Sequence, residues 1–130
     1  MEHLSIKLAT IMALSKKYRL KKRKDFEEVF KKGIYCSGSC ISIKLKRNNL
    51  NISRFGIVVG SRISKKAVIR NKIKRRISEA IRLNLPNLKR GFDVVVLVKP
   101  DIIVDKTYQE IEEILVGLFK KSGILKEQDN

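Results

Sequence analysis

Hydrophobic residues recur at the three-to-four-residue spacing of an amphipathic helix in three segments of the chain. The first begins near Asp25, which forms a capping-box pattern with Glu28, and ends at Gly33. The second covers about 67–85. The third covers roughly 106–121, and its predicted inward stripe consists of Tyr108, Ile111, Leu115, Leu118 and Phe119. The pattern therefore predicts three helices.

Strand patterns lie between these helices. Polar and apolar residues alternate over 34–47, most clearly over 41–46, which is typical of a strand with one face in water. The segments 55–59 and 92–98 are almost continuously apolar and suit strands buried on both faces. Asn48-Asn49 predicts a turn, so we expect 41–46 and 55–59 to pair as an antiparallel hairpin.

The chain has 130 residues, enough for one domain of ordinary size. We expect residues 1–15 to be a peripheral extension because they show no clear period. Residues 16–122 then form the single domain and 123–130 a polar C-terminal tail. No stretch reaches the 18 or so apolar residues that a membrane helix needs. Two cysteines, Cys36 and Cys40, predict free thiols in a reducing cytoplasm.

Charge indicates the kind of partner. Thirty Lys and Arg residues stand against 13 Asp and Glu residues, a formal net charge of +17. A polyanion explains such an excess better than a small substrate does. The 43% hydrophobic content argues against a disordered basic tail. The sequence thus predicts a folded protein that binds nucleic acid.

The segment 62–82 carries nine positive residues and one acid, Glu79. Ile69, Ile73, Ile77, Ala80 and Ile81 form one face of the predicted helix, while the opposite face carries Asn71, Lys74, Arg75, Ser78 and Arg82. Arg70 and Arg76 fall at the edges of the apolar face, where a long stem covers the core. An ordinary solvated face mixes Glu with Lys. This composition favours a phosphate-rich partner instead.

Candidate site residues follow from this charge map. The RNA-binding set around the basic helix is Arg62, Lys65, Lys66, Arg70, Asn71, Lys74, Arg75 and Arg82. A basic arm before the first helix contains Arg19, Lys21, Lys22 and Arg23. The aromatic candidates for stacking on unpaired bases are Phe26, Phe30 and Tyr35, with core packing an equal alternative for the phenylalanines.

We expect no catalytic residue and no metal site in the chain itself. His3 is the only imidazole, and with two cysteines it cannot complete a four-ligand zinc site. Asp93, Asp101 and Asp105 surround the last strand, where helix capping and loop solvation explain them better than metal binding does. Any chemistry is expected to belong to the partner.

The sequence resembles the protein component of bacterial ribonuclease P over about residues 16–122. The matching motifs are the segments 19–26 and 29–33, then Phe-Gly-Ile-Val-Val at 55–59, and Ala-Val-Ile-Arg-Asn-Lys-Ile-Lys-Arg at 67–75. The last of these is similar to the family's signature helix. The chain departs from the family at Ser78, where a basic residue is common, and near Lys44, where an aromatic residue is common.

The resemblance implies an α+β fold, a two-layer α/β sandwich of order αβββαβα like the second domain of ribosomal protein S5, with a left-handed βαβ crossover. It implies a protein subunit that binds a catalytic RNA through Arg70, Asn71, Lys74 and Arg75. It also implies that Phe26, Phe30 and Lys44 hold the 5′ leader of precursor tRNA, which the ribonucleoprotein removes. Mg²⁺ would be bound mainly by the RNA. No organic cofactor and no obligate protein partner are expected.

Two other function classes share parts of this pattern. A basic ribosomal protein would have the same composition without a role in tRNA processing. A DNA-binding module would need a recognition helix followed by a dimer element, and the sequence shows no such pair.

Overall fold

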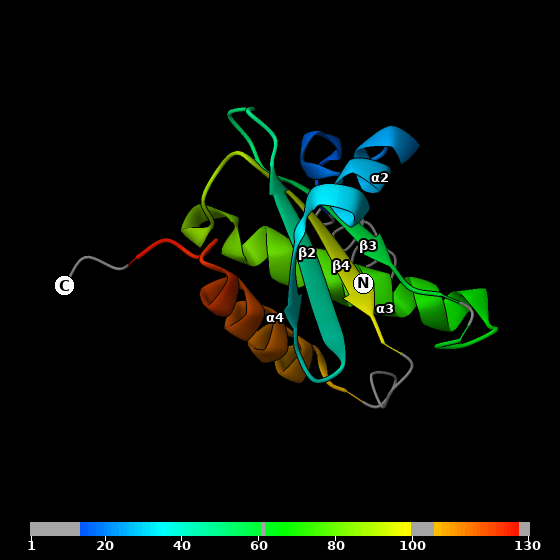
Figure 1. The fold of residues 1–130 in the computed structure, drawn as a ribbon. Coiled ribbons are helices and arrows are strands. Elements are labelled where there is room, and N and C mark those ends of the chain that lie inside the picture. Colours follow the sequence, from blue (N-terminus) through cyan, green and yellow to red (C-terminus); the bar gives the residue numbers. More distant parts are fainter. Residues whose placement is uncertain (1–13, 61, 100–105, 128–130) are drawn as a thin grey trace.

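The computed structural model describes residues 14–60, 62–99 and 106–127. Figure 1 shows a mixed fold in which helices lie on both sides of a single sheet. The elements in chain order are η1 (Lys16–Tyr18), α2 (Arg23–Lys32), β1 (Ile34–Ser37), β2 (Ile41–Arg47), β3 (Arg54–Val58), α3 (Ala67–Asn84), η2 (Leu85–Asn87), β4 (Phe92–Val98) and α4 (Tyr108–Ser122). The predicted α+β class and the order of helices and strands are confirmed.

The four strands form one sheet in the order β1-β2-β4-β3. β2 runs antiparallel to both β1 and β4, while β3 is parallel to β4 and connected to it through α3. The predicted hairpin between 41–46 and 55–59 is therefore wrong. β4 lies between these strands because Val94, Val95 and Val96 are fully buried, and a central position gives them cover on both faces.

Helices α3 and α4 cover one face of the sheet, and α2 lies on the other (Figure 1). On the first face the inward stripe of α4 packs with Ile73, Ile77 and Ile81 of α3 in the main core. On the second face Val29 of α2 packs against Leu20 and Val95 in a smaller cluster. α2 thus covers part of a sheet face that the other helices leave open.

The packed unit extends beyond the boundaries expected from the sequence. Leu14 is buried in the main core, so the extension expected over 1–15 does not include it; residues 1–13 lie outside the described part. Ile124 is also buried, and its carbonyl oxygen accepts a hydrogen bond from the Lys89 amide at 2.8 Å. The start of the predicted polar tail is therefore part of the fold. Both corrections arise because a single apolar residue shows no period.

The start of α2 also differs from the prediction. The helix begins at Arg23, with Lys22 as its N-cap and no side-chain cap, so Asp25 is inside the first turn. Its carboxylate instead lies 3.4 Å from the Arg54 guanidinium on β3. The predicted end at Gly33 is confirmed. Among the described helices, the capping box occurs at α4, where Thr107 and Glu110 exchange hydrogen bonds.

Candidate RNA interface

The exposed face of α3 carries the cations that the sequence singled out. Asn71, Lys74 and Arg75 are exposed, and together with Val68 and Ser78 they line a shallow hollow. Within the described residues, no carboxylate forms an ion pair with Lys74 or Arg75. The opposite side of the helix is buried, as predicted. This face is therefore fixed by the core and left with uncompensated positive charge.

The N-terminal end of α3 adds to that charge. Lys66 is the N-cap, and Arg62, Lys65 and Lys66 are all exposed. The first turn contains no acidic residue. Positive side chains at this end oppose the helix macrodipole, which stabilises anions there. The arrangement costs stability in the free protein and suits a partner that supplies phosphates.

Three arginines of α3 make bonds within the protein. The Arg70 Nη1 donates to the Ser64 carbonyl at 2.7 Å, and the Arg76 Nη1 donates to the Lys106 carbonyl at 2.7 Å. Both side chains are half-buried at the edges of the apolar face, as predicted. Arg82 forms an ion pair of 2.8 Å with Glu79. Arg70 and Arg82, both in the predicted RNA-binding set, therefore already make contacts within the protein.

A second surface lies where α2 meets the open sheet face. The Phe26 ring packs closely on Gly56 of β3 and is partly buried in the smaller cluster. Phe30, one turn later, leaves 40% of its surface exposed. The Lys44 ammonium on β2 donates to the Phe30 carbonyl, so this lysine also caps the last turn of α2. The structure thus brings the three predicted leader-binding residues together.

The same sheet face holds a polar cluster that the sequence analysis missed. Lys99 donates from Nζ to the Ser37 hydroxyl and to the Gly38 carbonyl, both at 2.8 Å. Hydrogen bonds with Ser42 and then Ser37 lower the pKa of Tyr35, and the charge of Lys99 lowers it further. Tyr35 is 53% exposed. Lys99 is far from Tyr35 in the chain, so no local pattern could have placed them together.

The basic arm runs beside β3 before it enters α2. The Leu20 amide donates to the Phe55 carbonyl at 2.9 Å, and the Arg19 Nε donates to the Leu14 carbonyl at 2.6 Å. Lys21, Lys22 and Arg23 are exposed. Arg23 forms a surface ion pair with Glu27 at 3.1 Å. The structure therefore uses Arg19 to anchor the arm and leaves Lys21 and Lys22 on its surface, while Arg23, predicted to lie in the arm, is the first residue of α2.

A partly buried ion pair fixes the end of the sheet beneath α2. Arg54 donates from Nη2 and Nε to the two carboxylate oxygens of Asp93, at 2.7 and 2.9 Å. Asn48 donates to the same carboxylate at 2.9 Å. Asp93, one of the acidic residues considered at the last strand, is thus occupied by protein donors. Asp101 and Asp105 lie outside the described residues.

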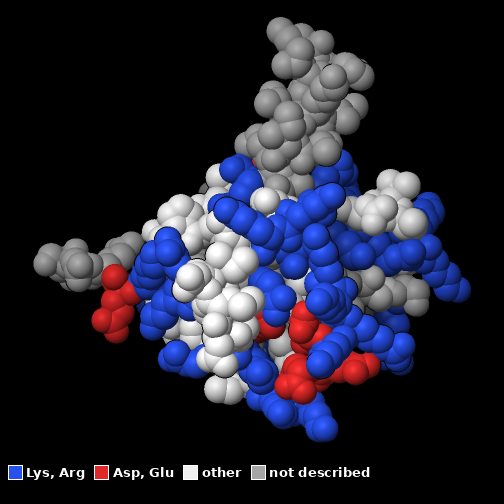
Figure 2. Space-filling model, turned by 90° about the horizontal axis from the view of Figure 1, so that it is seen from above, with Lys and Arg blue, Asp and Glu red and all other residues white. Residues whose placement is uncertain are grey.

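Positive charge is spread widely over one side of the molecule. Figure 2 shows the molecule from above, where Lys and Arg side chains spread over most of the visible face and acidic side chains gather in a few small areas. A polyanion that reaches the molecule from this side meets positive potential across a broad front. An ordered α+β core, an exposed cationic helix and exposed aromatic side chains beside the open sheet face define a small basic RNA-binding protein.

Comparisons with known proteins give the particular family. The family model described as Ribonuclease P matches residues 14–123. The ribonuclease P protein component of Clostridium botulinum is 38% identical over 110 residues, which cover 84% of this chain and 97% of that protein. The corresponding protein of Dictyoglomus turgidum is 38% identical over 112 residues, covering 85% and 93%.

Solved structures agree with these relatives. The RNase P protein of Staphylococcus aureus superposes with a TM-score of 0.76 at 28% identity, covering 84% of this chain and 98% of that chain. The RNase P protein from Thermotoga maritima gives a TM-score of 0.73 at 32% identity, covering 79% and 96%. The chain belongs to the ribonuclease P protein family.

Membership in the family establishes the function at the level of the complex. Ribonuclease P is an endoribonuclease of tRNA processing, and this chain is the protein subunit of that ribonucleoprotein, with the ribonuclease P RNA as its partner. The alternatives of a ribosomal protein and a DNA-binding module are set aside by these matches. Over the residues that the structure describes, no helix combines the length and apolarity required to cross a membrane.

Proposed function

We propose that the two surfaces divide the work of the subunit. The exposed face of α3, with Asn71, Lys74 and Arg75, binds the catalytic RNA. The surface between α2 and the open sheet face, with Phe26, Phe30 and Lys44, which we call the leader cleft, holds the 5′ leader of precursor tRNA. The observation that carries the first assignment is the uncompensated charge of Lys74 and Arg75 on a helix whose other side is locked into the core. Phosphates neutralise such a face and release counterions.

The cleft has the chemistry that single-stranded RNA requires. Phe30 and Tyr35 offer exposed rings on which unpaired bases can stack. The register places Tyr35 opposite Lys44, on the same sheet face, and Lys99 lies beside Tyr35. Two exposed rings that can stack on bases and two ammonium groups that can bind RNA phosphates therefore lie near one another on this side of the sheet. Such contacts tolerate varied leader sequences because they read stacking and charge.

Bond cleavage in this proposal belongs to the RNA. Mg²⁺ ions held by RNA phosphates would activate the attacking water. The described part of the chain has no group of three His, Cys, Asp or Glu side chains placed to hold a metal ion, and Asp93 is committed to Arg54. The protein would lower the Mg²⁺ requirement by supplying positive charge. The free thiols of Cys36 and Cys40 suit the reducing cytoplasm in which we place the complex.

Two variants test the division of work. Arg75→Ala should weaken binding to the catalytic RNA and reduce the slope of log affinity against log salt by about one. Phe30→Ala should weaken the reconstituted complex's binding of leader-bearing precursor more than of mature tRNA. Lys32→Ala removes the same charge from α2, where Lys32 pairs with Glu28, and serves as the charge control.

The results separate the two assignments. If Arg75→Ala changes affinity and salt slope no more than Lys32→Ala does, the α3 face is not the RNA contact. If Phe30→Ala weakens precursor and mature tRNA equally, Phe30 has no specific role in the leader cleft. Matched thermal unfolding of all variants ensures that binding, and not folding, is compared.

A further inference from the structure

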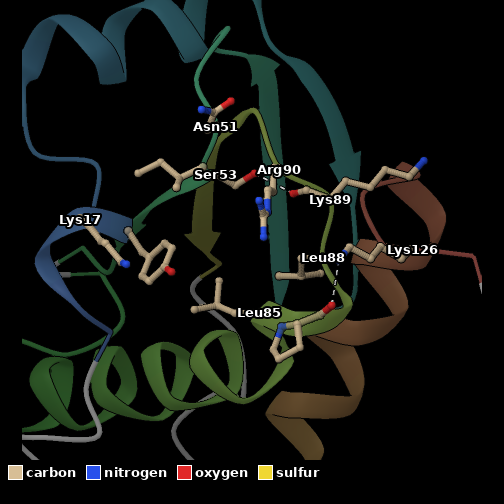
Figure 3. A pocket seen from close by; sticks show the side chains of 11 residues that line it. Lys17, Asn51, Ser53, Leu85, Leu88, Lys89, Arg90 and Lys126 are labelled. Carbon is tan, nitrogen blue, oxygen red and sulfur yellow. Dashed lines mark hydrogen bonds between the residues drawn. The ribbon is translucent and has the colours of Figure 1, made fainter.

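A hollow of about 440 Å³ opens beyond the C-terminal end of α3, away from both surfaces described above (Figure 3). Four cationic side chains line it: Lys17, Lys89, Arg90 and Lys126. No acidic residue is among its lining residues. In the part of the chain that the structure describes, none of these four cations forms an ion pair. Figure 3 shows the Lys89 ammonium pointing away from the hollow, so Lys17, Arg90 and Lys126 supply its positive charge, and no carboxylate of the lining compensates them.

The backbone that presents Arg90 is held rigidly. The buried Ser53 hydroxyl donates to the Lys89 carbonyl at 2.8 Å and accepts from the Phe92 amide at 3.0 Å, so it bridges the Arg90-Gly91 turn. Gly91 has φ +89°, and its carbonyl accepts from the Asn48 amide at 2.9 Å. Figure 3 shows the Arg90 guanidinium pointing into the hollow. A fixed turn lowers the entropy that Arg90 loses on binding.

Two further cations reach the hollow from other segments. The Lys17 ammonium lies 4.9 Å from the centre of the Tyr18 ring, which forms part of the wall. The Lys126 amide donates to the Asn87 carbonyl at 2.7 Å, and its ammonium donates to the Pro86 carbonyl at 3.1 Å. An ammonium carries three donors, so Lys126 keeps others for a ligand. Residues far apart in the sequence thus converge on one space.

The shape and charge point to a phosphate. A guanidinium offers a planar fork to two oxygens of a phosphate, and neighbouring ammonium groups add point charges. Tyr18 and Leu85 pack against the core on the α3–α4 side of the sheet, so the hollow lies on that side. Leu85 follows Arg75 by ten residues, about 15 Å along a helix axis. One RNA bound at Arg75 can therefore reach Arg90.

We propose that this hollow, which we call the Arg90 pocket, binds a backbone phosphate of the catalytic RNA and extends the contact made by α3. The inference rests on the proposed function of the α3 face. It adds a second anchor at the far end of the same helix, on the side of the sheet opposite the leader cleft.

The test is a salt titration of binding to the catalytic RNA with full-length protein. Arg90→Ala should weaken binding about threefold to tenfold and reduce the salt slope by about one. Arg90→Lys keeps the charge and should retain most of the slope. Lys32→Ala is the charge control, and Arg75→Ala is measured alongside. Arg90 is exposed, so these variants should keep the fold, which thermal unfolding checks.

The outcomes separate this pocket from the proposed function. If Arg75→Ala weakens binding and Arg90→Ala matches Lys32→Ala, the α3 assignment stands and the Arg90 pocket is overturned. If Arg90→Ala has its effect and Arg75→Ala has none, phosphate binding in the pocket stands, while the α3 assignment and the claim that the pocket extends its contact both fall. If Arg90→Ala affects only the binding of precursor tRNA by the assembled complex, the pocket faces the substrate, and the proposed ligand is wrong.

Discussion

The Phe26 ring of α2 occupies the space that a side chain at Gly56 of β3 would need. A Cβ at position 56 would lie 2.4 Å from two carbons of the ring, closer than real contacts allow. Gly56 therefore lets α2 lie directly on the sheet, and this contact sets the position of the helix that carries Phe30. The glycine is required for close approach, since its φ is not in the left-handed region.

Gly56→Ala should displace Phe26 and lower the free energy of unfolding by about 1–3 kcal/mol, the usual cost of overpacking. Urea denaturation measures this change. Gly60→Ala is the matched control because a Cβ there meets nothing within 4 Å, and it should change stability by less than about 0.5 kcal/mol. Equal stability of the two variants would show that Phe26 does not press on Gly56.

The Arg54–Asp93 pair should dominate the electrostatic stability of the sheet end. Arg54→Ala leaves the buried Asp93 carboxylate without its main partner, so we expect a loss of about 3 kcal/mol. Arg23→Ala removes an arginine whose pair with Glu27 is largely exposed, and it should cost less than about 1 kcal/mol. Denaturation midpoints at neutral pH compare the two. A similar cost for both would contradict the structural role of Arg54.

Two tyrosines should ionise in a fixed order. Hydrogen bonds with Ser42 and Ser37 lower the pKa of Tyr35, whereas burial, together with Glu112 and Glu79, raises the pKa of Tyr108 to about 12. An alkaline absorbance titration should therefore show Tyr35 deprotonating before Tyr108. Tyr35→Phe should remove the early phase and Tyr108→Phe the late one. A late phase that survives in Tyr108→Phe would refute the assignment.

The shift of Tyr108 also affects stability at high pH. The folded state holds the phenol proton more tightly than the unfolded state, in which the pKa is near 10. The resulting stabilisation is complete below about pH 10 and is lost as the pH rises through about 12. The free energy of unfolding should thus fall more steeply over this interval in the natural protein than in Tyr108→Phe. Parallel curves would argue against the shift.

Local sequence patterns located the three helices and the strands 55–59 and 92–98, but the alternation over 34–47 did not show that this segment forms two paired strands, β1 and β2. The spacing of Ile73, Ile77 and Ile81 indicates one face of a helix, and the valines at 94–96 indicate a buried strand. Both patterns can be recognised because they depend only on residues that are close in the chain. Strand order is different. Nothing in the sequence near Lys44 indicates that its neighbour in the sheet is Val95 of β4 and not a residue of β3. Pairing between distant segments depends on the packing of the whole sheet.

The same limit applies to the site. The cationic face of α3 was predicted because it lies on one helix, and the structure leaves Lys74 and Arg75 exposed there. The cluster of Tyr35 with Lys99 and the Arg90 pocket combine segments that meet only in the folded chain. Asp25 shows the converse error: its spacing to Glu28 matched a capping box, but the helix begins two residues earlier, and the Asp25 carboxylate faces Arg54 of β3.

The most direct test of the central claim is cleavage of precursor tRNA at low Mg²⁺ by the catalytic RNA alone, by this protein alone and by both together. The account predicts that the protein alone cleaves nothing, that the RNA alone is slow, and that the mixture releases the 5′ leader efficiently. Cleavage by the protein without RNA, or no gain on mixing, would contradict a non-catalytic subunit that works through RNA.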